Sequence, residues 1–174
     1  VLTKFKDQGR LRFIGLSDWS NSRIMKYIKM CDPDVVQPYR NVMDDGFIKS
    51  GLCSYINKNN LGVCFFSPIK HGLLTGKYDK PTSFELGDHR SGVKDFADQN
   101  VIDKMKQNKL LLEKRFTEHK YPVMRGLVDA LFNDAKSGCV LLGQRNVDQV
   151  NVASTLGEPM DEKDSVWVKS LYQH

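Results

Sequence analysis

One short loop carries residue types that are suited to holding a phosphate group. Gly72 and Gly76 allow the backbone to approach a ligand closely, and Thr75 and Lys77 place a hydroxyl and an ammonium group beside them. The loop follows the apolar residues 62–66, which read as a buried strand. Two glycines without a fixed motif predict either an anion-binding loop or an ordinary turn after that strand.

A second candidate anion site contains Arg145, whose planar guanidinium group matches the geometry of a phosphate. It stands between the apolar residues 139–143 and a predicted helix, and the free N–H groups at a helix N-terminus favour an anion. Asn146 and Gln149 have capping-box spacing, which explains both without a ligand and leaves Arg145 either phosphate-binding or solvated. Two anion sites after neighbouring strands indicate a ligand with two phosphates, such as a dinucleotide. The chain has no GxGxxG motif, so the Rossmann arrangement is excluded.

Three further residues have types that fit a cofactor ring. Gln37 lies in an apolar run and Ser17 lies at the end of another, so both could hold a carboxamide or could be satisfied by neighbouring backbone. Phe66 could be a core residue or a face on which an aromatic ring stacks.

The histidines and cysteines do not have the spacing of a metal site or of a base and nucleophile pair. We expect the histidines to be solvated or capping groups, namely His71, His89, His119 and His174. We expect the cysteines to be reduced thiols, mostly in the core, namely Cys31, Cys53, Cys64 and Cys139.

Composition limits the classes of function. The chain has 174 residues, the size of one domain, and a net charge of +5. This mild basic excess suits a phosphorylated ligand, but no block of like charges or recognition-helix signature indicates nucleic-acid binding. No apolar run is long enough for a membrane helix and no signal peptide opens the chain, so we expect a cytoplasmic protein without a membrane partner.

Apolar runs alternate with segments of helical spacing. The runs predict strands at residues 11–17, 34–37, 62–66 and 139–143. The helical segments are residues 20–31, 48–56, 98–119, 122–137, 146–156 and 161–172. This alternation predicts an α/β domain with a parallel sheet, either doubly wound or part of a barrel. The polar residues 79–97 predict a lid or binding loop, or a disordered segment.

Four segments, in order and spacing, resemble the C-terminal half of the aldo-keto reductases. They are FIGLSDWS from residue 13, DVVQP from residue 34, VCFFSPIKHGLLTGKY from residue 63 and VLLGQRNVDQV from residue 140. That family consists of (β/α)8 barrels that reduce carbonyls with NADPH. The resemblance implies that residues 1–174 form one domain, a half-barrel with strands five to eight and a C-terminal helix.

The resemblance also implies a set of NADPH-binding residues. The nicotinamide would meet Ser17, Asp18, Gln37 and Phe66. The pyrophosphate would lie in the loop containing Ser67, Ile69, Gly72, Leu73, Thr75, Gly76 and Lys77. The 2′-phosphate and its surroundings would contact Gly143, Gln144, Arg145 and Gln149.

Several positions depart from the family pattern. Asp18 replaces an asparagine, Val152 and Ala153 stand where a glutamate and an asparagine commonly meet adenine, and Arg40 takes a position often held by tyrosine. The family's catalytic aspartate, tyrosine, lysine and histidine lie on its first four strands, outside the matching segments. The resemblance therefore assigns no catalytic residue to this chain.

Three hypotheses follow for the function. The chain is the cofactor-binding half of an NADPH-dependent carbonyl or alcohol oxidoreductase, completed by an N-terminal half; or it is an NADPH-binding module without turnover; or it is an assembly domain. Its partners would be a small carbonyl substrate and a second half-barrel or another copy. Association is expected because strands 11–17 and 139–143 would be open edges, and because Phe13, Val36, Val63 and Val140 would face water.

Overall fold

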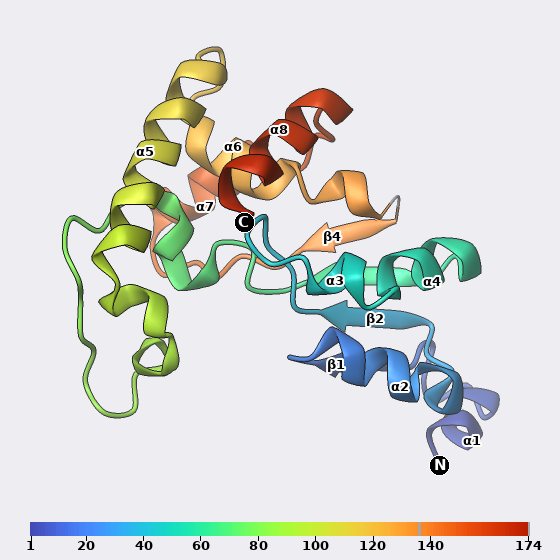
Figure 1. Cartoon of the computed structure of the whole chain (residues 1–174). Helices are drawn as coiled ribbons and strands as arrows, with labels where there is room; N and C mark the ends of the chain where they lie inside the picture. Colours follow the sequence, from blue (N-terminus) through green and yellow to red (C-terminus); the bar gives the residue numbers. More distant parts are fainter. Residues whose placement is uncertain (136, 174) are drawn as a thin grey trace.

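Four parallel strands form one sheet in the order β1-β2-β3-β4, so each strand pairs with the next one along the chain. The computed structural model describes residues 1–135 and 137–173. The strands are β1 Gly15–Asp18, β2 Val35–Pro38, β3 Gly62–Phe65 and β4 Gly138–Val140 (Figure 1). The predicted α/β fold with parallel strands is confirmed.

Helices connect the strands. They are α1 Leu2–Asp7, α2 Asn21–Cys31, α3 Gly46–Lys49, α4 Leu52–Asn59, α5 Gln99–Arg115, α6 Pro122–Asp129, α7 Val147–Ala153 and α8 Glu162–Tyr172. Short 3-10 turns are η1 Lys70–Thr75, η2 His89–Gly92, η3 Lys94–Ala97 and η4 Phe132–Asp134. Helices α5, α6 and α8 pack together beyond β4, and α1 lies at the opposite end of the molecule (Figure 1).

Side-chain caps fix where the predicted helices begin. Ser20 Oγ accepts a hydrogen bond from the Arg23 N–H at the start of α2. Asp98 and Asp161 cap α5 and α8 in the same way, because a carboxylate satisfies an N–H group that has no partner within the helix.

The two faces of the sheet differ. Val36, Val63 and Phe65 are buried beneath the helices. The other face carries Ser17 and Cys139, which are exposed, with Gln37 and Cys64, which are half-buried. The prediction that Val36 and Val63 face water is therefore wrong. Side chains alternate between the two faces of a strand, and these two valines point to the face that the helices cover. Val140 is also partly buried against the core, whereas Phe13 is exposed as expected.

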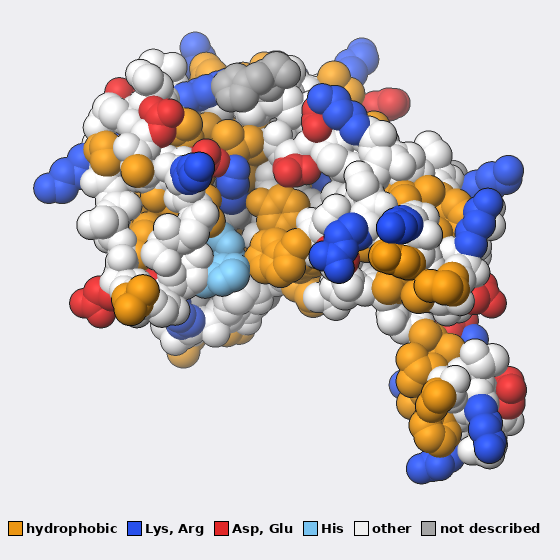
Figure 2. Space-filling view, turned by 60° about the horizontal axis from the view of Figure 1, so that its bottom comes forward, with side chains coloured by type: hydrophobic (Ala, Val, Ile, Leu, Met, Phe, Trp, Pro, Cys, Tyr) orange, Lys and Arg blue, Asp and Glu red, His pale blue; other side chains and the backbone are white. Residues whose placement is uncertain are grey.

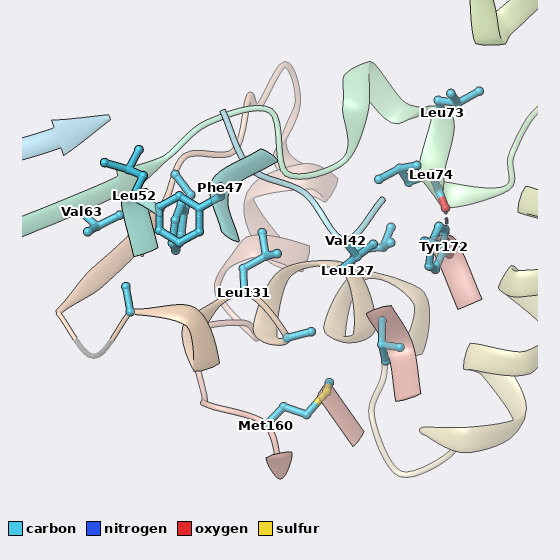
Figure 3. Close-up of a cluster of buried hydrophobic side chains, with 14 of the residues drawn as sticks. Val42, Phe47, Leu52, Val63, Leu73, Leu74, Leu127, Leu131, Met160 and Tyr172 are labelled. Carbon is cyan, nitrogen blue, oxygen red and sulfur yellow. Dashed lines mark hydrogen bonds between the residues drawn. The ribbon is translucent and has the colours of Figure 1, made fainter. Parts of the chain in front are cut away.

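The core lies between the sheet and the helices (Figure 3). It includes Phe47 from α3, Leu52 from α4, Leu127 from α6 and Tyr172 from α8. The Tyr172 hydroxyl donates a hydrogen bond to the Leu74 carbonyl oxygen at 3.2 Å, which ties the last helix to the loop after β3. The loop after β3 is therefore held to the core by this hydrogen bond and by the packing of buried side chains.

Several predicted boundaries are wrong. The first strand starts at Gly15 rather than residue 11, because the Ile14 N–H donates to the Asp34 carboxylate instead of to a strand. The predicted helix 48–56 is divided into α3 and α4 by Gly51, whose φ of 78° ends the first helix. Helix α6 ends at Asp129 and strand β4 at Val140, both earlier than predicted. Helix α7 ends at Ala153 rather than residue 156.

All four cysteines are free, as expected, but the prediction that they lie in the core is wrong. Cys31 and Cys139 are exposed, and Cys53 and Cys64 are only half-buried. Cys31 follows the helical spacing of Ile24 and Ile28, but it lies in the last turn of α2, where the buried face has ended.

Candidate functional site

The loops that follow β3 and β4 border a cleft of about 510 Å³. Because parallel strands end at the same edge of a sheet, residues far apart in sequence meet there. The lining residues that the sequence singled out are Phe66, Ser67, Ile69, Gly72, Lys77, Gly143, Arg145 and Gln149. The two predicted anion sites therefore open into one cleft.

Aromatic rings form one wall of the cleft. The centroid of Phe66 lies 4.9 Å from that of Trp19 and 5.7 Å from that of Tyr39. Figure 2 shows hydrophobic side chains beside the pale-blue histidines on this face. Trp19 is 55% exposed, so a planar ligand can reach its ring.

The loop after β3 holds an unusual backbone conformation. Ser67, Lys70 and His71 have φ values of 62°, 45° and 56°, in the left-handed region, and Gly72 follows with 91°. Each such non-glycine residue costs about 1–3 kcal/mol, and this strain concentrates at functional sites. Lys70 forms an ion pair with Asp95, which joins the loop to residues 79–97.

Residues 79–97 fold against the cleft. Phe84 and Tyr78 pack edge-on against the buried Phe96, with ring centroids 4.9 and 5.1 Å away. His89 and Arg90 of this segment line the cleft. Of the two interpretations of residues 79–97, the structure favours a loop that borders the cleft over a disordered segment.

Three cationic side chains reach the cleft. Arg90 is paired with Asp88 at 2.5 Å and lies over the Phe84 ring. Lys77 and Arg145 are exposed, and no carboxylate among residues 1–135 and 137–173 forms an ion pair with either. Two uncompensated positive charges at one cleft provide a field that attracts an anion.

Two histidines also line the cleft. His71 and His89 have ring centroids 5.1 Å apart, with the planes at 66°. Burial lowers the pKa of His71, and the neighbouring His89 and Arg90 charges lower it further. His71 is therefore neutral near pH 7 and can offer a hydrogen bond to a ligand. Both rings line the cleft; His89 is exposed, as expected for a solvated group, whereas His71 is half-buried, and His174 lies outside the described residues.

The segment before α7 has the predicted cap. Asn146 Oδ1 accepts a hydrogen bond from the Gln149 N–H at 3.0 Å. Gln149 Oε1 accepts one from the Arg145 N–H at 2.6 Å. The cap thus fixes the Arg145 backbone while its guanidinium group stays free to bind an anion.

The remaining predicted residues lie outside the cleft lining. Ser17 Oγ donates to the Gln37 carbonyl oxygen at 3.0 Å, which joins β1 to β2. Asp18 accepts a hydrogen bond from the Ser20 N–H at 2.8 Å and lies 3.4 Å from Arg23. Both side chains therefore already have partners within the protein.

The other four belong to the surrounding structure. Leu73 is fully buried, and Thr75 Oγ1 donates to the Gly72 carbonyl oxygen at 2.8 Å. A Cβ on Gly76 would lie 2.6 Å from the Met105 carbonyl oxygen, so glycine permits contact with α5. Gln144 lies in a separate depression beside α6 and α7.

Sequence reasoning missed Trp19, Asp88, His89 and Arg90 as cleft residues. Trp19 lies within the FIGLSDWS segment, where no role was assigned to it, and the others lie in a segment without periodicity. Arg40, which replaces a tyrosine of the family pattern, is buried in an ion pair with Asp134. The neighbouring Tyr39 instead presents an aromatic ring to Phe66.

Among the described residues, no group of three or more histidine, cysteine, aspartate or glutamate side chains is arranged to hold a metal ion. No helix within residues 1–135 and 137–173 is long and apolar enough to cross a membrane.

The sequence model of the aldo/keto reductase family matches residues 1–164. The chain belongs to the aldo/keto reductase family. A curated relative, an L-glyceraldehyde 3-phosphate reductase of Escherichia coli, is 25% identical over 149 residues, covering 82% of this chain and 43% of the relative. Another, a NADH-specific methylglyoxal reductase of the same species, is 27% identical over 110 residues, covering 62% of this chain and 33% of the relative.

The solved structure of a glycerol dehydrogenase from Gluconobacter oxydans superposes with a TM-score of 0.79 at 23% identity. The match covers 98% of this chain and 51% of that enzyme. Over its own length, this aldo/keto reductase chain therefore has an α/β fold of four parallel strands and helices that matches part of a barrel, and it spans about half the length of the proteins that it matches.

Proposed function

We propose that the cleft binds NADPH and that this chain supplies the cofactor-binding part of an aldo/keto reductase that interconverts carbonyls and alcohols. The observation that carries the proposal is the position of Lys77 and Arg145 at one cleft, both without a carboxylate partner among the described residues. A dinucleotide brings several negative charges to such a place.

The residues of the cleft fit the parts of this cofactor. The cleft volume of about 510 Å³ falls within the usual range of roughly 300–1,000 Å³ for ligand sites. Lys77 and the backbone at Gly72 would hold the pyrophosphate, and Arg145 would hold the 2′-phosphate. A Cβ added to Gly143 would meet no atom within 4 Å, which leaves room for a ligand there. Phe66 and Trp19 would flank the nicotinamide ring, whose chemistry when bound is hydride transfer.

The substrate would be a small aldehyde, ketone or alcohol, since the relatives named above act on such compounds. One relative is named as NADH-specific, so the preference for NADPH in this chain rests on Arg145. We further propose that the protein acts in the cytoplasm, where NADPH is available.

Calorimetric titration of the 174-residue chain with NADPH tests this proposal. We expect saturable binding with one site per chain, weakened at least tenfold by Lys77→Ala. Lys49→Ala is a matched control, because Lys49 is an exposed lysine of α3 that does not line the cleft. Absence of binding to the folded wild type, or equal losses for both variants, would contradict the assignment.

A second candidate is an NADPH-binding module without turnover. Burial raises the pKa of Tyr39, the tyrosine that contacts Phe66 and Trp19, and a raised pKa makes it a weaker proton donor. Carbonyl-dependent oxidation of NADPH, measured with and without an N-terminal barrel half, distinguishes the two candidates. Turnover that appears on mixing supports the oxidoreductase, and binding without turnover in any mixture supports the module.

A further inference from the structure

Residues 81–97 enclose a groove of about 670 Å³ that is separate from the cleft described above. All of its lining residues belong to this one segment, and none belongs to a strand of the sheet. The groove is therefore formed within the segment itself and does not depend on the edges or faces of the sheet. Its volume falls within the range of roughly 300–1,000 Å³ that is usual for sites of small molecules.

The side chains of the groove combine apolar surface with positive charge. The apolar surface comes from the Phe84 and Phe96 rings and from Val93. The charged groups are Arg90 and Lys94, and no aspartate or glutamate of the described residues lines the groove. Apolar surface beside positive charge is complementary to an apolar ligand that carries a negative charge.

Nearby carboxylates do not neutralise Lys94. Its side chain is exposed and forms no ion pair within residues 1–135 and 137–173. Asp95, the next residue in the chain, pairs with Lys70 instead, and Glu85 does not line the groove. Lys94 therefore offers an uncompensated charge to a ligand in the groove.

Arg90 lines both the groove and the cleft. Its guanidinium carbon lies 4.1 Å from the centroid of the Phe84 ring, and its Nη2 donates a hydrogen bond to Asp88 Oδ2 at 2.5 Å. Asp88 itself lines the cleft. The position of one guanidinium group therefore affects the charge in both cavities.

We propose that the groove is a second ligand site, which takes an apolar carboxylate such as a medium-chain fatty acid, and that its occupation weakens the binding of NADPH in the cleft. The carboxylate would bind Lys94 and Arg90, and the hydrocarbon chain would cover Phe84 and Phe96. Because this carboxylate competes with Asp88 for Arg90, Asp88 would lose its counter-charge and would repel the phosphates in the cleft. The coupling rests on the NADPH site proposed above, whereas occupation of the groove does not.

Calorimetric titration of the 174-residue chain with octanoate, in the absence of NADPH, tests the groove. We expect saturable binding of one octanoate per chain, and weaker binding of octanamide, which has the same tail without the charge. Lys94→Ala should weaken octanoate about two- to fivefold, the range for an exposed ion pair, and Ser83→Glu, which adds a negative charge to the lining, should abolish binding.

Two lysines outside the lining of the groove serve as controls. Lys80→Ala should leave octanoate binding unchanged, because Lys80 is an exposed lysine of the same segment. Lys77→Ala should also leave it unchanged, because Lys77 lines the cleft instead. Circular dichroism of each variant establishes that the fold is retained. Absence of octanoate binding, equal binding of octanamide, or a loss in Lys77→Ala rather than in Lys94→Ala would overturn the proposal.

Titration with NADPH at rising concentrations of octanoate tests the coupling. We expect the dissociation constant of NADPH to rise to a plateau at about fivefold or more above its starting value. Asp88→Asn should remove this rise while it retains octanoate binding, because the amide has no charge to uncover. Asp79→Asn is the control, since Asp79 pairs with Lys106 outside both cavities.

Three results would overturn the coupling. They are a dissociation constant that rises without a plateau, which indicates direct competition in the cleft, a rise that persists in Asp88→Asn, and no change in NADPH affinity when octanoate is bound. If the chain binds octanoate but no NADPH, the proposed function and the coupling are both contradicted, and the groove site stands.

Discussion

Arg40 Nε donates a hydrogen bond to Asp134 Oδ2 at 2.9 Å, across 94 positions of sequence. The two side chains are only 1% and 7% exposed, and Lys169 adds a second cation 2.6 Å from the same carboxylate. The cluster joins the loop after β2 to η4 and α8, and it therefore holds together the elements behind the cleft.

Replacing Asp134 by asparagine should destabilise the fold. The change leaves the buried Arg40 without its counter-charge, which typically costs about 3–5 kcal/mol. Urea unfolding measures the loss. Asp45→Asn is the control, because Asp45 pairs with Lys49 at the surface, where an ion pair contributes roughly 0–1 kcal/mol. Similar losses of unfolding free energy for the two variants would show that the buried cluster stabilises the fold no more than a surface ion pair does.

Replacing Gly76 by alanine should cost more than the same change at Gly9. The two glycines have nearly equal φ values, 67° and 69°, so the backbone strain is matched. The new Cβ at residue 76 would meet α5 at 2.6 Å, whereas the one at residue 9 would meet nothing within 4 Å. We expect a difference of about 1–3 kcal/mol from overpacking. Thermal or urea unfolding of both variants gives the comparison, and equal effects would mean that the contact with α5 relaxes freely.

Binding of NADP⁺ should strengthen as the pH falls through the range just below 6.5. Burial and nearby cations hold the pKa of His71 below its ordinary value, so the ring is neutral at pH 7 and gains a proton only in more acidic solution. A bound phosphate favours the protonated ring, and by linkage the proton favours the phosphate.

The measurement is the pH dependence of the dissociation constant from pH 5 to 8. The ligand's own phosphate titrates in this range, so the difference between the wild type and His71→Gln isolates the histidine. His119→Gln is the control, since His119 contacts the Thr155 carbonyl oxygen away from the cleft. Parallel curves for the wild type and His71→Gln would exclude a contribution from His71.

The chain should associate through the uncovered parts of the sheet. β1 and β4 each pair with one strand only within the described residues, and Phe13 beside β1 is 65% exposed. Unpaired strand edges and exposed apolar groups favour association with another half-barrel or a second copy. Sedimentation at micromolar concentration should show a species larger than 19.9 kDa.

Phe13→Lys should shift that association toward the monomer. Met30→Lys is the control, because Met30 is 75% exposed on α2 and does not border the sheet. A compact monomer of the wild type at all concentrations would exclude the proposed association.

Local patterns were sufficient to predict the alternating elements. The apolar run at residues 62–66 predicted β3, and the predicted helix starts at residues 20, 98 and 161 coincide with the capping residues Ser20, Asp98 and Asp161. Boundaries failed where a distant group competed for the backbone, as when Asp34 took the Ile14 N–H. Such competition depends on tertiary contacts that a local pattern does not contain.

The two segments proposed to bind anions were predictable because each combines glycine or a helix start with a cation. Their meeting at one cleft depends on the strand order, which the alternation of strands and helices left open between a doubly wound sheet and a barrel. His89 and Arg90 could not be predicted, because residues 79–97 have no period and their position depends on Phe84 and Tyr78 packing against Phe96.

In the proposed complex, Arg145 holds the 2′-phosphate of NADPH in this cleft. Titration of the wild type and of Arg145→Ala with NADPH and with NADH tests it most directly, and Arg12→Ala serves as the control because Arg12 precedes β1 and does not line the cleft. We predict that Arg145→Ala weakens NADPH by about 1–3 kcal/mol, the range for a hydrogen bond to a charged group, and leaves NADH nearly unchanged. Equal losses for NADPH and NADH, or no loss for either, would contradict the account.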